Sequence, residues 1–81
     1  MTMYFLRTCD RAGQVLSNRC VEARDVYGAL ARANQHLQAF VLGSGQQQVD
    51  PLGRIDVADR NGHTVARLVC AEAIATSGKA Q

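Results

Sequence analysis

Two histidines and three cysteines are the side chains best suited to act as nucleophiles or general bases: His36, His63, Cys9, Cys20 and Cys70. Catalysis requires such a group to be held beside an orienting partner. No spacing in the chain places one of them in a recognised catalytic motif. His36 is expected on the solvent side of a helix and His63 follows a turn glycine, where polar side chains are routine. We therefore expect no catalytic residues and no enzymatic activity.

The cysteines are also candidate metal ligands. A zinc site built from them and a histidine would require the first and last strands to pair, and the local spacing typical of zinc ligands is absent. An odd number of cysteines without CxxC spacing indicates reduced thiols, although one could form a disulfide between chains. We expect Cys20 and Cys70 to be buried in strands and Cys9, beside a turn, to be exposed. The sequence thus predicts no metal and no cofactor.

Arginine dominates the basic residues, since all but Lys79 of the nine Lys and Arg residues are arginine. Guanidinium groups bind carboxylates and phosphates in a bidentate manner. Arg7, Arg54 and Arg67 would form a basic platform if they shared one face of a sheet, with Asp56 and Glu72 diluting its charge. The net charge of +2 is far below that of a densely cationic surface. Nucleic-acid binding through these arginines is therefore an alternative function, and a solvated face of mixed charge is the simpler interpretation.

The bulk composition indicates a single globular domain. The chain has 81 residues, 47% of them apolar and 20% charged, which leaves room for one core. No apolar run is long enough to span a bilayer, and the first residues do not resemble a signal peptide. We expect one domain over residues 1–75, a flexible tail over residues 76–81, and a cytoplasmic protein with no membrane association.

The first half of the chain predicts a hairpin followed by a helix. Residues 3–8 are typical of a strand, residues 10–13 of a turn, and residues 14–21 of an irregular second strand with a bulge at residues 17–19. From Asp25 the spacing becomes helical. The apolar stripe consists of Val26, Leu30, Ala33, Leu37, Phe40 and Val41. Asp25 is expected to cap this helix and Gly43 to end it. Gly28 within the helix indicates either close approach to another backbone or a helix-propensity cost that is simply tolerated.

The second half predicts a flexible connector and a second hairpin. The connector covers residues 43–52, and the hairpin pairs residues 54–59 with residues 64–70 around a turn at residues 60–63. Ile55 and Val57 should face the helix, whereas Arg54, Asp56 and Ala58 should face away from it. Residues 71–75 either extend the last strand or form a helical turn. The predicted fold is α+β, a two-layer ββαββ arrangement of one helix on a four-stranded, mostly antiparallel sheet.

The chain resembles a family of short uncharacterised bacterial proteins, a domain of unknown function with this same element order. The likeness covers about Met3 to Leu68 and includes Tyr4-Phe5, Asp10 and Gly13, then Asp25 with residues 29–33, and finally residues 57–65. It departs at residues 17–22, where the family usually has an acidic Asp-x-Glu-Gly turn. The resemblance implies a bacterial protein of this fold and brings no assigned function.

A sheet covered by one helix leaves its other face exposed, and both strand parities here contain apolar residues. Such a face or a free edge binds other chains. We therefore expect a non-catalytic protein-binding or regulatory module that binds a partner, a second copy of itself as a homodimer, or both. A phage-borne or mobile-element inhibitor of a host complex fits equally well. The predicted interaction surface consists of Tyr4, Phe5, Arg7, Arg54, Asp56, Arg67 and Val69.

Overall fold

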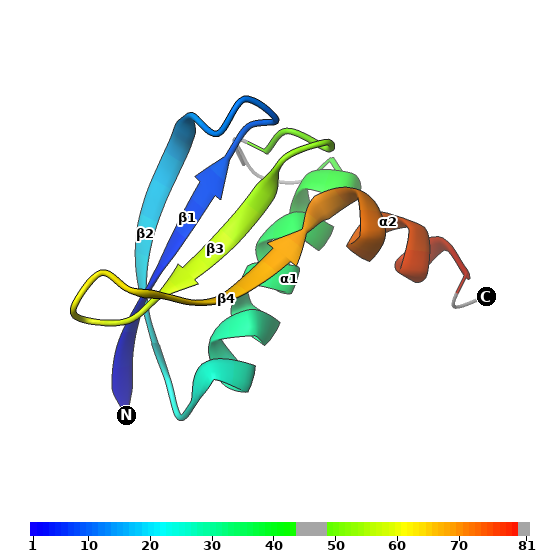
Figure 1. The fold of residues 1–81 in the computed structure, drawn as a ribbon. Coiled ribbons are helices and arrows are strands. Elements are labelled where there is room, and N and C mark those ends of the chain that lie inside the picture. Colours follow the sequence, from blue (N-terminus) through cyan, green and yellow to red (C-terminus); the bar gives the residue numbers. More distant parts are fainter. Residues whose placement is uncertain (44–48, 80–81) are drawn as a thin grey trace.

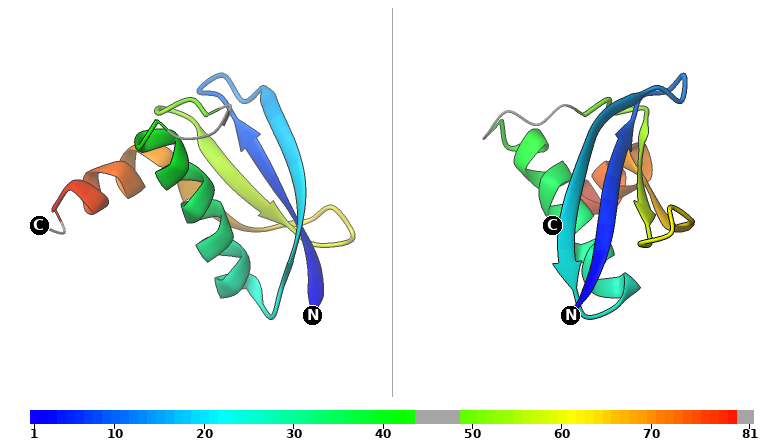
Figure 2. Two further views of the ribbon diagram at one scale, coloured as in Figure 1. Left: turned by 180° about the vertical axis from the view of Figure 1, so that it is seen from behind. Right: turned by 90° about the vertical axis from the view of Figure 1, so that its left-hand side faces the viewer.

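The computed structural model describes residues 1–43 and 49–79. The elements follow in the order β1 (Thr2–Cys9), β2 (Val15–Ala23), α1 (Val26–Val41), β3 (Arg54–Ala58), β4 (Thr64–Val69) and α2 (Cys70–Lys79). The strands form one antiparallel sheet of order β2-β1-β3-β4, and α1 lies across one of its faces (Figures 1 and 2). The predicted α+β fold, with a helix packed on a four-stranded antiparallel sheet, is confirmed.

Helix α1 begins and ends at the predicted residues. The side chain of Asp25 accepts a hydrogen bond of 2.9 Å from the backbone N–H of Gly28, which caps the first turn. At the other end Gly43 has φ +74°, a left-handed conformation that glycine adopts without the Cβ clash of other residues. The stripe is rotated relative to the prediction: Val41 is 47% exposed. The central buried positions are Ala29, Ala33 and Leu37.

The core lies between α1 and the sheet. Alternate residues of three strands point toward the helix, namely Tyr4 and Leu6, Val21 and Ala23, and Ile55 and Val57. The predicted inward orientation of Ile55 and Val57 is confirmed. The small side chains of α1 allow it to lie close to the strands. A Cβ added to Gly28 would lie 3.3 Å from the Cβ of Ala23, so the close approach expected at this glycine is to a side chain.

The two hairpins use the same turn. In each, the first residue of an Asp-Arg-x-Gly sequence accepts a hydrogen bond from the glycine N–H through its backbone carbonyl, at 2.9 Å for Asp10 and 3.0 Å for Asp59. The carboxylate of each aspartate accepts two further backbone hydrogen bonds from inside its own turn. Gly13 and Gly62 both have positive φ, near 90°. These are loops closed by a type I turn and a left-handed glycine.

Each hairpin also has a bulge just after its turn. Thr8 pairs with Ser17 and Cys9 with Val15, so that the extra residue is Leu16. The second hairpin repeats this shift between Val57 and Ala58. The predicted bulge at residues 17–19 was therefore wrong in position, because the register change belongs to the turn geometry rather than to the polar residues that follow.

Strand β4 continues directly into α2. Cys70, Ala73 and Ile74 are spaced for one helical face, and they pack against the core. This favours the helical alternative for residues 71–75. Residues 76–79, where the predicted flexible tail begins, belong to α2, and residues 80–81 lie outside the described residues. Residues 44–48 of the predicted connector also lie outside them. Within the described ranges, no helix is long and apolar enough to cross a membrane.

Gly53, which immediately precedes β3, lies directly against the end of β1. A Cβ added there would overlap the carbonyl oxygen of Cys9 and lie 3.0 Å from the Cα of Asp10. Its own carbonyl accepts a 3.2 Å hydrogen bond from the N–H of Cys70, where α2 begins. One residue without a side chain thus joins three elements.

Gly53→Ala is expected to lower the free energy of unfolding by about 3 kcal/mol, because the methyl group meets backbone that cannot change rotamer. The matched control is Gly43→Ala. It meets no atom within 4 Å and should cost about 1 kcal/mol, the cost of a left-handed alanine. Urea denaturation followed by circular dichroism measures both. Equal losses for the two variants would contradict the close packing at Gly53.

Candidate functional site

The face of the sheet opposite α1 carries the candidate site, and we call it the open face. Its side chains include Met3, Phe5, Arg7 and Cys9 of β1, Asn18, Cys20 and Glu22 of β2, Arg54, Asp56 and Ala58 of β3, and Arg67 and Val69 of β4. The register places Arg7 directly opposite Asp56, and Asp56 directly opposite Arg67. Residues distant in sequence therefore meet in one row across the middle of the sheet.

Asp56 organises this row. Its carboxylate accepts a hydrogen bond of 3.2 Å from the Nε of Arg54 and one of 2.8 Å from the Nε of Arg67. The Asp56 side chain is only 7% exposed, while those of Arg54 and Arg67 are 32% and 54% exposed. A carboxylate buried to this degree is stable only when it is paired. The two ion pairs fix both guanidinium groups by one edge and leave their terminal nitrogens to other ligands.

The arginine cluster, which we define as Arg7, Arg54 and Arg67 around Asp56, has a surplus of positive charge. Three guanidinium groups face one carboxylate, so the local charge is +2. Within residues 1–43 and 49–79, Arg7 has no ion pair. Guanidinium groups placed by neighbouring side chains bind carboxylates and phosphates strongly. The open face can therefore recognise an anionic group.

Two hollows flank the cluster. One of about 230 Å³, the basic hollow, is lined by Asp10, Arg11, Leu52, Gly53, Arg54, Arg67 and Val69. The other, of about 430 Å³, lies at the opposite end of the strands and is lined by Met1, Thr2, Met3, Phe5, Glu22 and Arg60. We call it the N-terminal hollow. A ligand lying along the strands would contact the N-terminal hollow, the arginine cluster and the basic hollow.

An ion pair holds the wall of the basic hollow. Arg11 donates from Nη2 to Oδ1 of Asp50 at 2.9 Å and from Nε to Oδ2 at 3.0 Å, and its backbone N–H also donates to this carboxylate. The hydrogen bond from the Arg11 side chain, followed by those from backbone N–H groups, holds the pKa of the Asp50 carboxyl well below its usual range. The pair ties the first turn to the segment that precedes β3.

Most of the predicted interaction surface is gathered on the open face. Phe5, Arg7, Arg54, Asp56, Arg67 and Val69 all lie there. The prediction that Tyr4 belongs to this surface was wrong. Its side chain is 7% exposed and lies in the core, because alternation along the strand points Tyr4 toward α1 when Phe5 points away. Sequence reasoning missed Met3 and Leu52. Alternation from Phe5 would have identified Met3, whereas Leu52 enters through a loop that has no periodicity.

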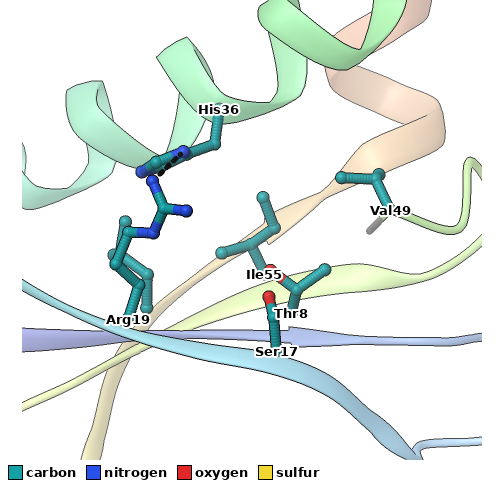
Figure 3. A pocket seen from close by; sticks show the side chains of 7 residues that line it. Thr8, Ser17, Arg19, His36, Val49 and Ile55 are labelled. Atoms are coloured by element: carbon teal, nitrogen blue, oxygen red, sulfur yellow. Dashed lines mark hydrogen bonds between the residues drawn. The ribbon is translucent and has the colours of Figure 1, made fainter. Parts of the chain in front are cut away.

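A separate polar cavity lies on the helix side, near the edge strand β2. It measures about 20 Å³, enough for a water molecule, and Figure 3 shows Thr8 and Ser17 on its sheet side. His36 on α1 faces Arg19, with 3.5 Å between Nδ1 and Nη1. His36 is thus half-buried and faces the sheet, so its expected solvent position was wrong. No cysteine or carboxylate lines this cavity among the described residues.

The cysteines are arranged differently from the prediction. Cys70 is buried as expected, but Cys9 is 2% exposed and Cys20 is exposed, which reverses the expectation for both. Cys9 ends the central strand β1, where Gly53 lies against its backbone, whereas Cys20 lies on an edge strand. Among the described residues, no three His, Cys, Asp or Glu side chains are close enough together to hold a metal ion.

Comparisons with known proteins identified no relative of the chain. No protein-family model, no curated protein and no solved structure matched the chain. The chemistry of the site therefore rests on the geometry described above.

Only Cys20 is expected to react rapidly with a thiol reagent at pH 8. Cys9 and Cys70 are buried, and burial also raises the pKa of the Cys70 thiol, which lowers its thiolate fraction. Counting modified thiols over time with iodoacetamide and mass spectrometry measures this. Cys20→Ser should remove the fast phase, and denaturation should expose all three cysteines of the wild type. A fast phase that survives in Cys20→Ser would contradict the burial of Cys9 and Cys70.

Asp50→Asn is expected to lower stability at pH 7 and to matter less in acid. The folded-state pKa of Asp50 lies below the unfolded value of about 3.9, so the ion pair stabilises the fold above that value. This contribution is lost as the pH falls toward the folded-state pKa. Urea denaturation of wild type and variant should therefore show a constant difference above about pH 5 that narrows below about pH 4.

Glu22→Gln is the matched control for this experiment, because Glu22 is exposed and has no ion pair in the described part of the chain. A difference between wild type and Asp50→Asn that stays the same from pH 7 to pH 2 would show that the Arg11–Asp50 pair does not contribute.

Proposed function

We propose that the protein is a small non-catalytic binding module that holds another protein against the open face of its sheet. The observation that carries this proposal is the arginine cluster, a surplus of +2 fixed by the buried Asp56 on the face that α1 leaves uncovered. Like charges held this close repel one another, and an anionic group bound beside them would relieve that repulsion.

The surroundings of the cluster support a protein as the ligand. Arginine, methionine and aromatic residues are enriched at protein interfaces, and the open face combines all three in Arg7, Met3 and Phe5. Met3 is 40% exposed and Val69 is 40% exposed, so apolar surface is available on both sides of the cluster. Partner binding would cover it.

The cellular role of the module is also part of the proposal and is suggested by the sequence alone. A cytoplasmic bacterial regulator and a phage-borne or mobile-element inhibitor of a host complex would both use such a surface, and the resemblance to short bacterial proteins agrees with either. A homodimer is better served by the free edge of β2 or β4 than by the open face. Two open faces brought together would place one arginine cluster against another.

Nucleic-acid binding is the second candidate function. Arg7, Arg54 and Arg67 could contact phosphates while Phe5, on the same face, stacks on a base. Against it, the rest of the open face is acidic or apolar at Glu22 and Met3. A charge surplus of this size supplies few phosphate contacts.

Affinity purification of the tagged protein from its native cells tests the main proposal. Wild type is expected to retain a stoichiometric protein partner, and Arg7→Glu and Arg67→Glu are expected to lose it. Arg7 has no ion pair among the described residues, so Arg7→Glu breaks none, and because it places a second carboxylate opposite Asp56, circular dichroism checks that each variant is folded. Arg32→Glu, on the exposed side of α1, is the matched control and should retain the partner.

Retention of the same partner by Arg7→Glu and Arg67→Glu would rule out the open face as the binding surface. Recovery of nucleic acid instead of protein would favour the second candidate. A gel shift that weakens steeply from about 50 mM to 200 mM salt would then be expected, since phosphate contacts release counterions.

A further inference from the structure

We infer that the edge strand β2 pairs with β2 of a second copy of the chain, in an antiparallel register that places Cys20 opposite Cys20 on a twofold axis. The two sheets would then continue into one sheet of eight strands, with α1 of both copies on the same face. This interface lies at an edge of the sheet rather than on the open face. The inference therefore goes beyond the proposed function and can fail while the proposed function holds.

Strand β2 has an unpaired edge. It lies at one end of the strand order β2-β1-β3-β4, so one row of its backbone N–H and C=O groups has no partner strand among the described residues. The right-hand view of Figure 2 looks onto this edge. Residues 17–23 contain no proline and no lysine, the residues that commonly block pairing at an edge. The other edge strand, β4, has six residues against nine for β2 and continues directly into α2.

The sequence of β2 favours one register of self-pairing. The bulge at Leu16 leaves residues 17–23 as the regular part of the strand, and Cys20 is their midpoint. Pairing centred on Cys20 therefore overlaps the whole regular part and places Arg19 opposite Val21. Centring one residue earlier or later shortens the overlap, and the earlier register also places Arg19 opposite Arg19. Like charges directly opposite one another destabilise a strand pair.

The same register brings together two charged side chains that have no ion pair within one copy. On the open face Asn18 lies opposite Arg7 of its own β1, and in the dimer Asn18 also lies opposite Glu22 of the second copy. Neither Arg7 nor Glu22 has an ion pair in the described part of the chain. The strands that carry them would lie about 10 Å apart, twice the spacing of neighbouring strands. Arginine and glutamate side chains are long enough to meet across the shorter asparagine.

Charges then alternate along one row that crosses from one copy to the other. Arg67, Asp56 and Arg7 lie in this row within one copy, and Glu22 of the second copy continues it. Inside a single copy Glu22 lies opposite Met3, about 13 Å from Arg7 along β1, so the contact does not form there. Twofold symmetry makes the contact twice. In each copy three guanidinium groups then lie beside two carboxylates, so the open face keeps a positive surplus.

Sedimentation velocity of the reduced full chain tests the dimer. A strand-pair interface is small, so we expect a dissociation constant on the order of 100 µM, with the single copy predominating at low micromolar concentration. Glu22→Arg should weaken the dimer at least about tenfold, because two attractive contacts become repulsive. The exchanged variant Arg7→Glu/Glu22→Arg should recover most of this loss. Arg32→Glu, on the exposed side of α1, is the matched control and should have no effect. Circular dichroism confirms that each variant is folded.

Oxidation of the wild type with diamide tests the register. Directly opposite residues of an antiparallel pair have Cα atoms about 4.5 to 5.5 Å apart, which suits a disulfide. Two Cys20 thiols are expected to form an S–S bond between copies while two protons and two electrons pass to diamide. Cys9 and Cys70 are buried and do not compete. Mass spectrometry identifies the bond.

The matched control for the oxidation is Cys20→Ser/Arg32→Cys, which has an exposed thiol on α1 away from the edge. It should cross-link about tenfold more slowly, because its thiols meet only by random collision.

A reduced wild type that stays monomeric up to about 1 mM, a dimer that Glu22→Arg does not weaken, or cross-linking no faster than in the control would overturn the inference. A dimer without the Cys20–Cys20 bond would assign the contact to another surface, such as the edge of β4, and overturn it as well. The proposed function fails separately. If the wild type is monomeric but Arg67→Glu loses the cellular partner, then the open face is right and the dimer is wrong.

Discussion

The residues of the open face are exposed because α1 packs against only one of the two faces of the sheet. The helix brings Ala29, Ala33 and Leu37 onto Ile55 and Val57, and these residues form the single core that a chain of this length can build. In the described residues, no element covers the other side of the sheet, and α2 packs beside α1 rather than across the open face (Figure 2). Half of each strand must therefore be compatible with water while it remains part of the same sheet.

The open face is made compatible with water by charged side chains as well as by the alternation of polar and apolar residues along its strands. Asp56 lies in the middle of the open face and is nearly inaccessible to water, because two arginine side chains cover it. Such an arrangement contributes less to stability than an apolar core of the same volume. Its effect is on position, since the buried carboxylate holds the guanidinium groups of Arg54 and Arg67 in fixed orientations on the open face. That property is useful for binding and has little use in a purely structural sheet.

The turns of the two similar hairpins lie at the two ends of the open face. Each Asp-Arg-x-Gly turn is followed by a bulge, which increases the local twist of the strand pair. At one end the first turn is held by the Arg11–Asp50 pair and by the contact at Gly53. Arg11 and Gly53 both line the basic hollow. The basic hollow thus forms where the two hairpins meet, and its lining residues come from the first turn, the segment before β3, β3 and β4.

Local spacing in the sequence determined the helix from Asp25 to Gly43, the turns at both Asp-Arg-x-Gly segments and the side of β3 on which Ile55 and Val57 lie. These features follow from contacts between residues near one another in the chain, so caps, glycines and periodicity were sufficient to predict them. Only the tertiary structure decided that β1 lies in the centre, that Tyr4 and Cys9 are buried while Cys20 is exposed, and that residues 76–79 are helical. It also decided that Arg7, Asp56 and Arg67 form one row. Strand order and register are set by pairing between distant segments, and the burial of a side chain depends on which neighbours that pairing supplies.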